Sequence, residues 1–192
     1  VNMFQVQANE KSITISSHIT KEADKILIGD PVRLNQILIN LISNALKFTH
    51  TGTIRLNCYV DRHEGQECYM RFDVADTGIG IPSDKLTTIF ESFSQADASV
   101  TRKYGGTGLG LTIVKQLVDL QQGTISVKSE EDKGSTFSVT IPYLVGSSKD
   151  ITEISKQARK SKSYLNSLKK LNILLVEDND ITRLYAINIL KT

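Results

Sequence analysis

The segment from Asp30 to Thr49 is apolar around nearly all of its circumference when its residues are placed on a helix. Asp30 is a favourable helix N-cap residue, and Pro31 suits the first helical position. One narrow arc of this predicted helix is polar and consists of Arg33, Gln36, Asn40, Asn44 and Lys47. Because a helix that is apolar over most of its surface is buried, we expect this polar arc to face a pocket rather than bulk water.

Two glycine-bearing strings follow this helix along the chain. The first reads Asp76-Thr77-Gly78-Ile79-Gly80-Ile81, and the second reads Gly105-Gly106-Thr107-Gly108-Leu109-Gly110-Leu111. The second string leads into a predicted helix from Leu109 to Gln122, so backbone N–H groups at that helix start form an anion site suited to phosphates. Together with amides for a hydrated metal ion and a lysine on the polar arc, the pattern indicates a nucleotide site.

Two more motifs accompany these three, namely Phe90-Glu91-Ser92-Phe93 and Gly134-Ser135-Thr136-Phe137. In their order along the chain, the five resemble the asparagine box, the first glycine box, the phenylalanine box, the second glycine box and the last glycine motif of sensor histidine kinases. The resemblance covers residues 1 to 144 and is specific. It implies the Bergerat ATP-binding fold of the GHKL superfamily, with ATP and Mg²⁺ as cofactors.

Asp76 ends an apolar strand and precedes two glycines. A carboxylate there can accept a hydrogen bond from the 6-amino group of adenine, while the glycines let the ring lie against the backbone. The matching aspartate has this role in histidine kinases, although an aspartate that only caps a turn is the alternative. Guanine would present a carbonyl oxygen to the carboxylate, so we expect ATP to be preferred over GTP.

The polar arc supplies the groups expected to contact metal and phosphate. We expect Asn44 to be the direct Mg²⁺ ligand, Asn40 to orient a metal-bound water and Lys47 to meet phosphate. Arg102 and Lys103 are expected to close over the γ-phosphate, with a plain basic loop as the alternative. The positions expected to hold the nucleotide are Asn44, Asp76, Gly78, Gly80, Gly105, Gly106, Thr107, Gly108, Leu109, Gly110 and, by family resemblance alone, Thr136.

Asn40 also bears on the reaction. Gyrase, MutL and chaperone-type ATPases share the fold but place a glutamate at the matching position. Glutamate can activate water for hydrolysis, whereas asparagine cannot act as a general base. The sequence therefore favours a protein-histidine kinase that passes the γ-phosphoryl group of Mg-ATP to an external acceptor. A GHKL-type ATPase or ATP-gated switch, and a non-catalytic nucleotide-binding module, are the alternatives.

The order of predicted strands and helices indicates an α+β fold, a two-layer α/β sandwich with a mixed sheet and helices on one face. Expected elements include strands at Lys11–Thr20, Ile54–Val60, Cys68–Val74, Thr124–Ser129 and Ser135–Pro142, a hairpin turn at Arg62–Gln66, and a short helix from Pro82 to Phe90. We expect the end of an upstream dimerisation or linker helix at 1–10, the catalytic domain at 11–145, a linker at 146–170 and a truncated receiver domain at 171–192.

Residues 171–179 read as an apolar strand that ends in acidic residues, and a helical pattern follows at 181–190. This pair resembles the first strand and helix of a flavodoxin-like response-regulator receiver. In an intact receiver, the resemblance implies that Glu177 and Asp178 help to hold a divalent metal. The phosphate-accepting aspartate of that family lies on a later strand, so neither residue is expected to be the acceptor.

A histidine kinase needs a phosphoaccepting histidine on a dimerisation helix. His18 falls in a predicted strand, His50 after a helix and His63 in a hairpin, so none has that context. The resemblance therefore implies, as partners, a histidine-bearing dimerisation domain of the same protein and a receiver domain or response regulator. The missing helices would make the intact protein a homodimer.

The overall composition is that of a soluble globular protein. Of 192 residues, 40% are hydrophobic and 23% are charged, which is enough for a sizeable core. The net charge of +2 gives no reason to expect direct binding of nucleic acid. No apolar run approaches the length of a membrane span, no signal peptide opens the chain, and Cys58 and Cys68 fit a reduced cytoplasm. Whether the parent protein is anchored in the inner membrane, and which signal it senses, stays open.

Overall fold

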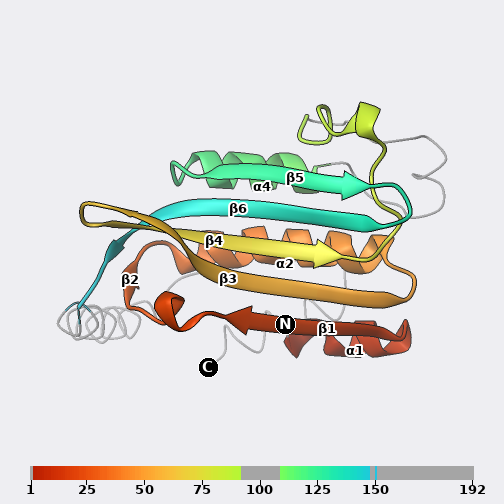
Figure 1. The fold of residues 1–192 in the computed structure, drawn as a ribbon, viewed down its shortest axis with the longest axis horizontal. Coiled ribbons are helices and arrows are strands. Elements are labelled where there is room, and N and C mark those ends of the chain that lie inside the picture. The colour runs from red at the N-terminus through yellow and green to blue at the C-terminus, as the bar shows by residue number, and fades with distance from the viewer. Residues whose placement is uncertain (1, 92–108, 148–149, 151–192) are drawn as a thin grey trace, which may run out of the picture. The chain divides into compact units, whose positions relative to one another are not determined.

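The computed structural model describes residues 2–91, 109–147 and 150. The chain divides into two compact units, Val1–Gly146 and Ser147–Thr192, and nearly all of the described residues belong to the first. In this unit a mixed sheet forms one layer, and the helices α2 (Pro31–Phe48) and α4 (Gly110–Asp119) lie together on one face of it (Figure 1). This arrangement confirms the predicted α+β two-layer sandwich.

Along the chain, the two main helices α2 and α4 alternate with the strands of the sheet. The described helices are η1 Asn2–Phe4, α1 Gln5–Glu10, η2 Lys21–Ala23, α2 Pro31–Phe48, η3 Ser83–Lys85 and α4 Gly110–Asp119, where η denotes a 3₁₀ turn. The strands are β1 Ile13–Ile19, β2 Leu27–Ile28, β3 Gly52–Glu64, β4 Glu67–Asp76, β5 Thr124–Glu130 and β6 Gly134–Val145.

The strand order across the sheet is β1-β3-β4-β6-β2, and β5 also pairs with β6. β1 runs parallel to β3, while the β3–β4, β4–β6, β5–β6 and β2–β6 pairs are antiparallel. β6 therefore joins β4 to both β5 and β2, and it supplies Ser135 as the partner of Asp76 at the end of β4.

The helix α2 begins where the sequence predicts. The carboxylate of Asp30 accepts hydrogen bonds from the backbone N–H groups of Val32, at 3.0 Å, and Arg33, at 3.1 Å, and so satisfies two of the free donors at the helix start. Five side chains on the sheet-facing side are buried: Ile37, Leu41, Ile42, Ala45 and Leu46. The helix is not buried all round, however, because Ile39 is 39% and Val32 is 73% exposed.

The core lies between the sheet and these two helices. Alternate residues of β4 are buried, which is the period of a strand with one covered face, whereas β6 is buried along most of its length. From α4, Val114 and Val118 are fully buried against them. The alternating pattern predicted for residues 68–74 is therefore confirmed, with Cys68, Met70, Phe72 and Val74 buried.

Several predicted boundaries were wrong. The hairpin turn is shorter than Arg62–Gln66, because the strands continue to Glu64 and Glu67. The turn is tight because Gly65 adopts a φ of +59°, a conformation that glycine takes without strain. In place of a helix from Pro82 to Phe90, only Ser83–Lys85 is helical, as a 3₁₀ turn.

Neither cysteine forms a disulfide. Cys58 pairs with Phe72 across the β3–β4 ladder and Cys68 with His63, so the two do not face each other, and both are free. None of the described helices combines the length and hydropathy that a bilayer crossing needs. Most of the predicted linker at 146–170, and all of the predicted receiver start at 171–192 with Glu177 and Asp178, lie outside the described residues.

Candidate functional site

The N-terminus of α4 faces the polar arc of α2. A Cβ atom placed on Gly110, the first residue of α4, would lie 3.8 Å from Oδ1 of Asn40 and 3.8 Å from Nδ2 of Asn44. The first backbone N–H groups of a helix have no partner within it and carry partial positive charge. Two side-chain amides and an anion-attracting helix end therefore converge at one place.

Asn40 is held by its own helix. Its Nδ2 donates a hydrogen bond of 3.0 Å to the carbonyl oxygen of Gln36, one turn earlier. Since the amide nitrogen is engaged in this way, Oδ1 is the atom turned toward Gly110. Both Asn40 and Asn44 are half-buried, which is the exposure of side chains at the rim of a site rather than in the core.

The two ends of the polar arc have different surroundings. Arg33, near the start of α2, forms an exposed ion pair with Asp30 at 3.0 Å, so it is a structural part of the helix start. Lys47, in the last turn, is half-buried, and its Nζ lies 4.9 Å from the centre of the Phe48 ring. The cation therefore stays near the C-terminal end of α2, on the side that carries Asn44.

Asp76 ends β4 and is half-buried. Its Oδ1 accepts a hydrogen bond of 2.8 Å from the backbone N–H of Gly78. Burial raises the pKa of this carboxyl above its ordinary value, while hydrogen bonds from the backbone N–H groups of Gly78 and Ser135 act in the opposite direction. The carboxylate is thus oriented by the backbone and retains the capacity to accept a further hydrogen bond from a ligand.

The first glycine string runs past the C-terminal end of α2. The backbone N–H of Ile79 donates to the carbonyl oxygen of Phe48 at 3.2 Å. A Cβ atom on Gly78 would overlap the same carbonyl oxygen, so only glycine permits this approach. The contact brings Asp76 to the end of the helix that carries Lys47, and thereby joins the two halves of the predicted site.

The turn between β5 and β6 lies against the same glycine string, at the right of Figure 1. The backbone N–H of Asp132 donates to the carbonyl oxygen of Ile79 at 2.8 Å. Gly80 has a φ of +68°, and a Cβ atom there would overlap the carbonyl oxygen of Glu130. The string is therefore packed between α2 on one side and the β5–β6 turn on the other.

Thr136, assigned to the site by family resemblance, occupies a different register position from Asp76. It pairs with Ala75, whereas Asp76 pairs with Ser135. Because successive side chains of a strand alternate between faces, Ser135 shares a face with Asp76 and Thr136 lies on the other face. Sequence reasoning missed Ser135 as a site residue, although it lies in the last glycine motif, and it also missed Ser129. The pairing of Ser135 with Asp76 and with Ser129 is evident only from the strand registers.

Only some of the other predicted site residues lie in the described part of the structure. Leu109 is the N-cap of α4, and its carbonyl oxygen accepts a 2.9 Å hydrogen bond from the N–H of Ile113. The predictions for Arg102, Lys103, Gly105, Gly106, Thr107 and Gly108 lie outside the described residues. His18 and His63 lie in strands and His50 follows α2, so none of the three lies on a helix.

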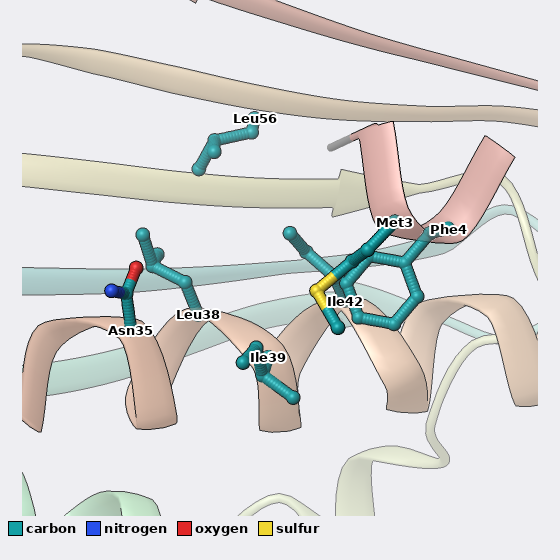
Figure 2. Close-up of a pocket in the computed structure, with 7 residues that line it drawn as sticks. All are labelled: Met3, Phe4, Asn35, Leu38, Ile39, Ile42 and Leu56. Atoms are coloured by element: carbon teal, nitrogen blue, oxygen red, sulfur yellow. The ribbon is translucent and has the colours of Figure 1, made fainter. Parts of the chain in front are cut away.

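A separate hollow of about 280 Å³ lies between η1, α2 and β3. Figure 2 shows its lining, which is Met3, Phe4, Asn35, Leu38, Ile39, Ile42 and Leu56. Asn35 is the single polar side chain among them, and no charged group is present in this lining to hold phosphate. The hollow is therefore distinct from the site formed by Asn40, Asn44 and Asp76.

Among the described residues, no group of three or more histidine, cysteine or acidic side chains is placed to hold a metal ion. A magnesium ion held by one amide oxygen, phosphate oxygens and water needs no such group, because Mg²⁺ retains several of its waters. The donor set at the start of α4 fits an ion that arrives with a polyphosphate.

Comparison with known proteins identifies the family. Residues 29–145 match the model of the histidine kinase-, DNA gyrase B-, and HSP90-like ATPase family. The chain is 45% identical over 179 residues to the autoinducer 2 sensor kinase/phosphatase LuxQ of Vibrio vulnificus (strain CMCP6), covering 93% of this chain and 20% of that protein. It is 41% identical over 165 residues to histidine kinase 5 of Arabidopsis thaliana, covering 75% of this chain and 18% of that protein.

Solved structures give the same result. Full-length ShkA, in complex with AMPPNP, matches with a TM-score of 0.66 and 33% identity, over 77% of this chain and 29% of that one. The catalytic domain of the histidine kinase ThkA matches with a TM-score of 0.58 and 27% identity, over 73% of this chain and 87% of that one. The chain spans about a fifth of the length of the curated relatives it matches. It belongs to the histidine kinase-, DNA gyrase B-, and HSP90-like ATPase family and is a homologue of sensor histidine kinases.

Proposed function

We propose that this chain is the ATP-binding catalytic domain of a hybrid sensor histidine kinase, which transfers the γ-phosphoryl group of Mg-ATP to a histidine on a dimerisation domain. The observation that carries the proposal is the convergence of Asn40 and Asn44 on Gly110 at the start of α4, 3.8 Å from a Cβ position there. Side-chain amides beside a helix N-terminus suit a magnesium-bound polyphosphate.

Each half of the site has its own task. Asp76, oriented by the N–H of Gly78, accepts the hydrogen bond of the adenine 6-amino group. Glycines at positions 78 and 80 keep the string that follows Asp76 packed between α2 and the β5–β6 turn, because a side chain at either position would overlap neighbouring carbonyl groups. The purine would therefore lie beside the first glycine string and the phosphates beside the start of α4.

Charge neutralisation would be the main contribution of the phosphate side. Phosphoryl transfer depends on positioning and on stabilising the charge of the transferred group. Lys47 and the N–H groups at the start of α4 supply positive charge, and Arg102 and Lys103 are proposed to add more. Asn44 would hold the magnesium ion and Asn40 would orient its water. When bound, this ion would neutralise charge on the phosphates.

Asn40 supports transfer rather than hydrolysis. Its Nδ2 is engaged with the Gln36 carbonyl oxygen, and its Oδ1 is a neutral amide oxygen with negligible basicity. Water beside the γ-phosphate would therefore lack a general base from this residue. An ATP molecule bound in such a site persists until an acceptor arrives, which suits a kinase whose acceptor lies on another domain.

The proposal extends to the partners. We infer that residues 146–170 connect the catalytic domain to the start of a receiver at 171–192, whose Glu177 and Asp178 would bind a divalent metal in an intact domain. The phosphoryl group would pass from histidine to a receiver aspartate, within a homodimer. Two free cysteines in the catalytic domain and the use of ATP support a cytoplasmic location for it.

The test uses the longer coding sequence that includes the dimerisation helices, incubated with γ-labelled ATP and Mg²⁺. Acid-labile label on the protein, absent from Asp76→Asn and Asn44→Ala variants, is the expected result. Label that appears only as free phosphate would show an ATPase. Isothermal titration of the 192-residue chain with Mg-ATP gives the binding step separately, and absence of binding at millimolar ATP would overturn the proposal.

A further inference from the structure

The hydroxyl of Ser129 lies at the junction of three backbone segments. It is half-buried at the end of β5. Its Oγ accepts a hydrogen bond of 2.8 Å from the backbone N–H of Ile81, which ends the first glycine string. The same Oγ lies 2.9 Å from the carbonyl oxygen of Gly134 and 2.9 Å from Oγ of Ser135.

One arrangement of protons satisfies all three contacts. A serine hydroxyl has one proton to donate and two lone pairs with which to accept. If Ser129 donates to the Gly134 carbonyl oxygen, it accepts from the Ile81 N–H and from the Ser135 hydroxyl. The full capacity of the Ser129 side chain is then used, so it forms a rigid connection between the glycine string and the β5–β6 turn.

This connection leads directly to Asp76. Ser135 is the cross-strand partner of Asp76, and its backbone N–H is one of the two that bond the Asp76 carboxylate. Gly134, the other partner of Ser129, has a φ of +108°, and a Cβ atom there would overlap the Asp76 carbonyl oxygen. Ser129 thus holds one residue that bonds the Asp76 carboxylate and one that packs against the Asp76 backbone.

We infer that Ser129 is a positioning residue for purine recognition, which sets the distance between the glycine string 77–81 and the Gly134–Ser135 segment so that Asp76 points at the base. The inference rests on the proposed ATP site and adds to it a residue outside the five motifs. Ser129 bonds Ile81, Gly134 and Ser135 rather than the residues proposed to hold phosphate and metal, so its effect would fall on nucleotide affinity and base selectivity.

The experiment compares Ser129→Ala and Ser129→Thr in the full chain. Loss of one neutral hydrogen-bonding group is expected to weaken ATP binding about three- to tenfold. The ratio of ATP to GTP affinity is expected to fall as well, because the carboxylate is no longer aimed. Ser129→Thr retains the hydroxyl on a strand-compatible side chain and is expected to restore both values. Ser126→Ala, at an exposed position of the same strand, is the matched control.

Amide hydrogen exchange at Ile81, measured without nucleotide, tests the connection independently of ATP. Faster exchange in Ser129→Ala, and not in Ser126→Ala, is expected. Unchanged exchange, or an equal loss of ATP and GTP affinity with the ratio preserved, would overturn the inference while the ATP site stands. If the unmodified chain binds no ATP, the proposed function fails, and this inference fails with it. Thermal unfolding of each variant identifies any loss of the fold.

Discussion

The backbone N–H of Gly78 donates a hydrogen bond of 2.8 Å to Oδ1 of Asp76, two residues before it. The local turn orients a carboxylate that is also partly withdrawn from water. Burial disfavours the charged form, and the two backbone donors favour it. The Asp76 carboxylate is therefore a well-oriented hydrogen-bond acceptor, and its burial in the charged form lowers the stability of the ligand-free protein.

Replacing Asp76 by asparagine is expected to weaken ATP binding. Loss of a hydrogen bond to a charged group costs about 1.5–3 kcal/mol, or roughly tenfold to a hundredfold in affinity. The new amide can donate to the guanine carbonyl oxygen, so the preference for ATP over GTP is expected to narrow. Titration calorimetry with both nucleotides measures this. Asp73→Asn, whose carboxylate bonds Tyr59 and Arg71, is the control and should keep its affinity.

The same substitution is expected to stabilise the ligand-free protein at neutral pH. Because the pKa of Asp76 is raised in the folded state above its ordinary value of 3.8, the fold binds its proton more tightly than the unfolded chain does. Stability from this residue is therefore complete below the ordinary pKa and is lost as pH rises through the folded pKa.

Asp76→Asn mimics the protonated carboxyl, so its advantage in urea unfolding should be present at pH 7. The advantage should shrink as pH falls through the folded pKa. Urea unfolding at several pH values checks the sign. An advantage that grew toward low pH would contradict the assignment of burial as the main cause.

Gly110→Ala is expected to change stability and binding in opposite directions. The position is helical with no positive φ, so alanine should stabilise the protein by about 0.4–1 kcal/mol. Its methyl group would stand 3.8 Å from both asparagine amides, in the space proposed for magnesium and phosphate, so ATP affinity should fall. Thermal unfolding measures the expected gain in stability, and ATP titration measures the expected loss of affinity.

A matched control comes from Gly65→Ala. Gly65 lies in the hairpin turn with a φ of +59°, and nothing is within 4 Å of a Cβ there. Alanine at this position should lower stability and leave ATP affinity unchanged. If Gly110→Ala kept wild-type affinity, the site would have to lie elsewhere.

Asn40→Glu is expected to raise phosphate release. A glutamate beside the γ-phosphate can act as a general base, a contribution of roughly 10²–10⁴-fold where it is well placed. The substitution also loses the hydrogen bond to Gln36, so we expect a gain at the lower end of this range. A coupled phosphate-release assay measures it, with Asn35→Glu, which lines the separate hollow, as the control. A phosphate-release rate equal to that of the unmodified chain would contradict the inference that Asn40 favours transfer over hydrolysis.

Asp30→Ala is expected to destabilise the protein by about 0.5–2 kcal/mol, because α2 loses both hydrogen bonds at its start. Asp30→Ser can accept one of these bonds and should recover most of the loss. The exposed pair with Arg33 contributes little in either case. Urea unfolding of the unmodified chain and the two variants ranks their free energies of unfolding. An alanine variant as stable as the serine variant would contradict the capping role.

The predicted features that depend on neighbouring residues were found where the sequence placed them. Asp30 and Pro31 start a helix through local hydrogen bonding and a fixed φ, and the alternation of residues 68–74 marks a half-covered strand. Short-range chemistry was sufficient for these. The approach of Gly110 to Asn40 and Asn44, in contrast, joins two separate helices, and the set of motifs rather than local chemistry led to it.

The features that depend on distant residues were not predicted. The two-residue strand β2 exists only because Leu27 and Ile28 pair with β6, and no local pattern announces it. The exposure of Ile39 depends on how far α4 and the sheet extend around α2. Ser129 and Ser135 became visible only through the registers of β4, β5 and β6, since each is an ordinary serine in its own strand.

The position of β6 in the sheet has a consequence for how the protein is made. β6 provides the second neighbour of β4 and the partner of both β5 and β2, yet it is the last of the six strands to leave the ribosome. Until residue 145 has emerged, β4 has an unpaired edge and Asp76 lacks Ser135, its partner on that edge. The nascent domain must therefore remain open through most of its synthesis, and nucleotide cannot assist its folding before the final strand is in place.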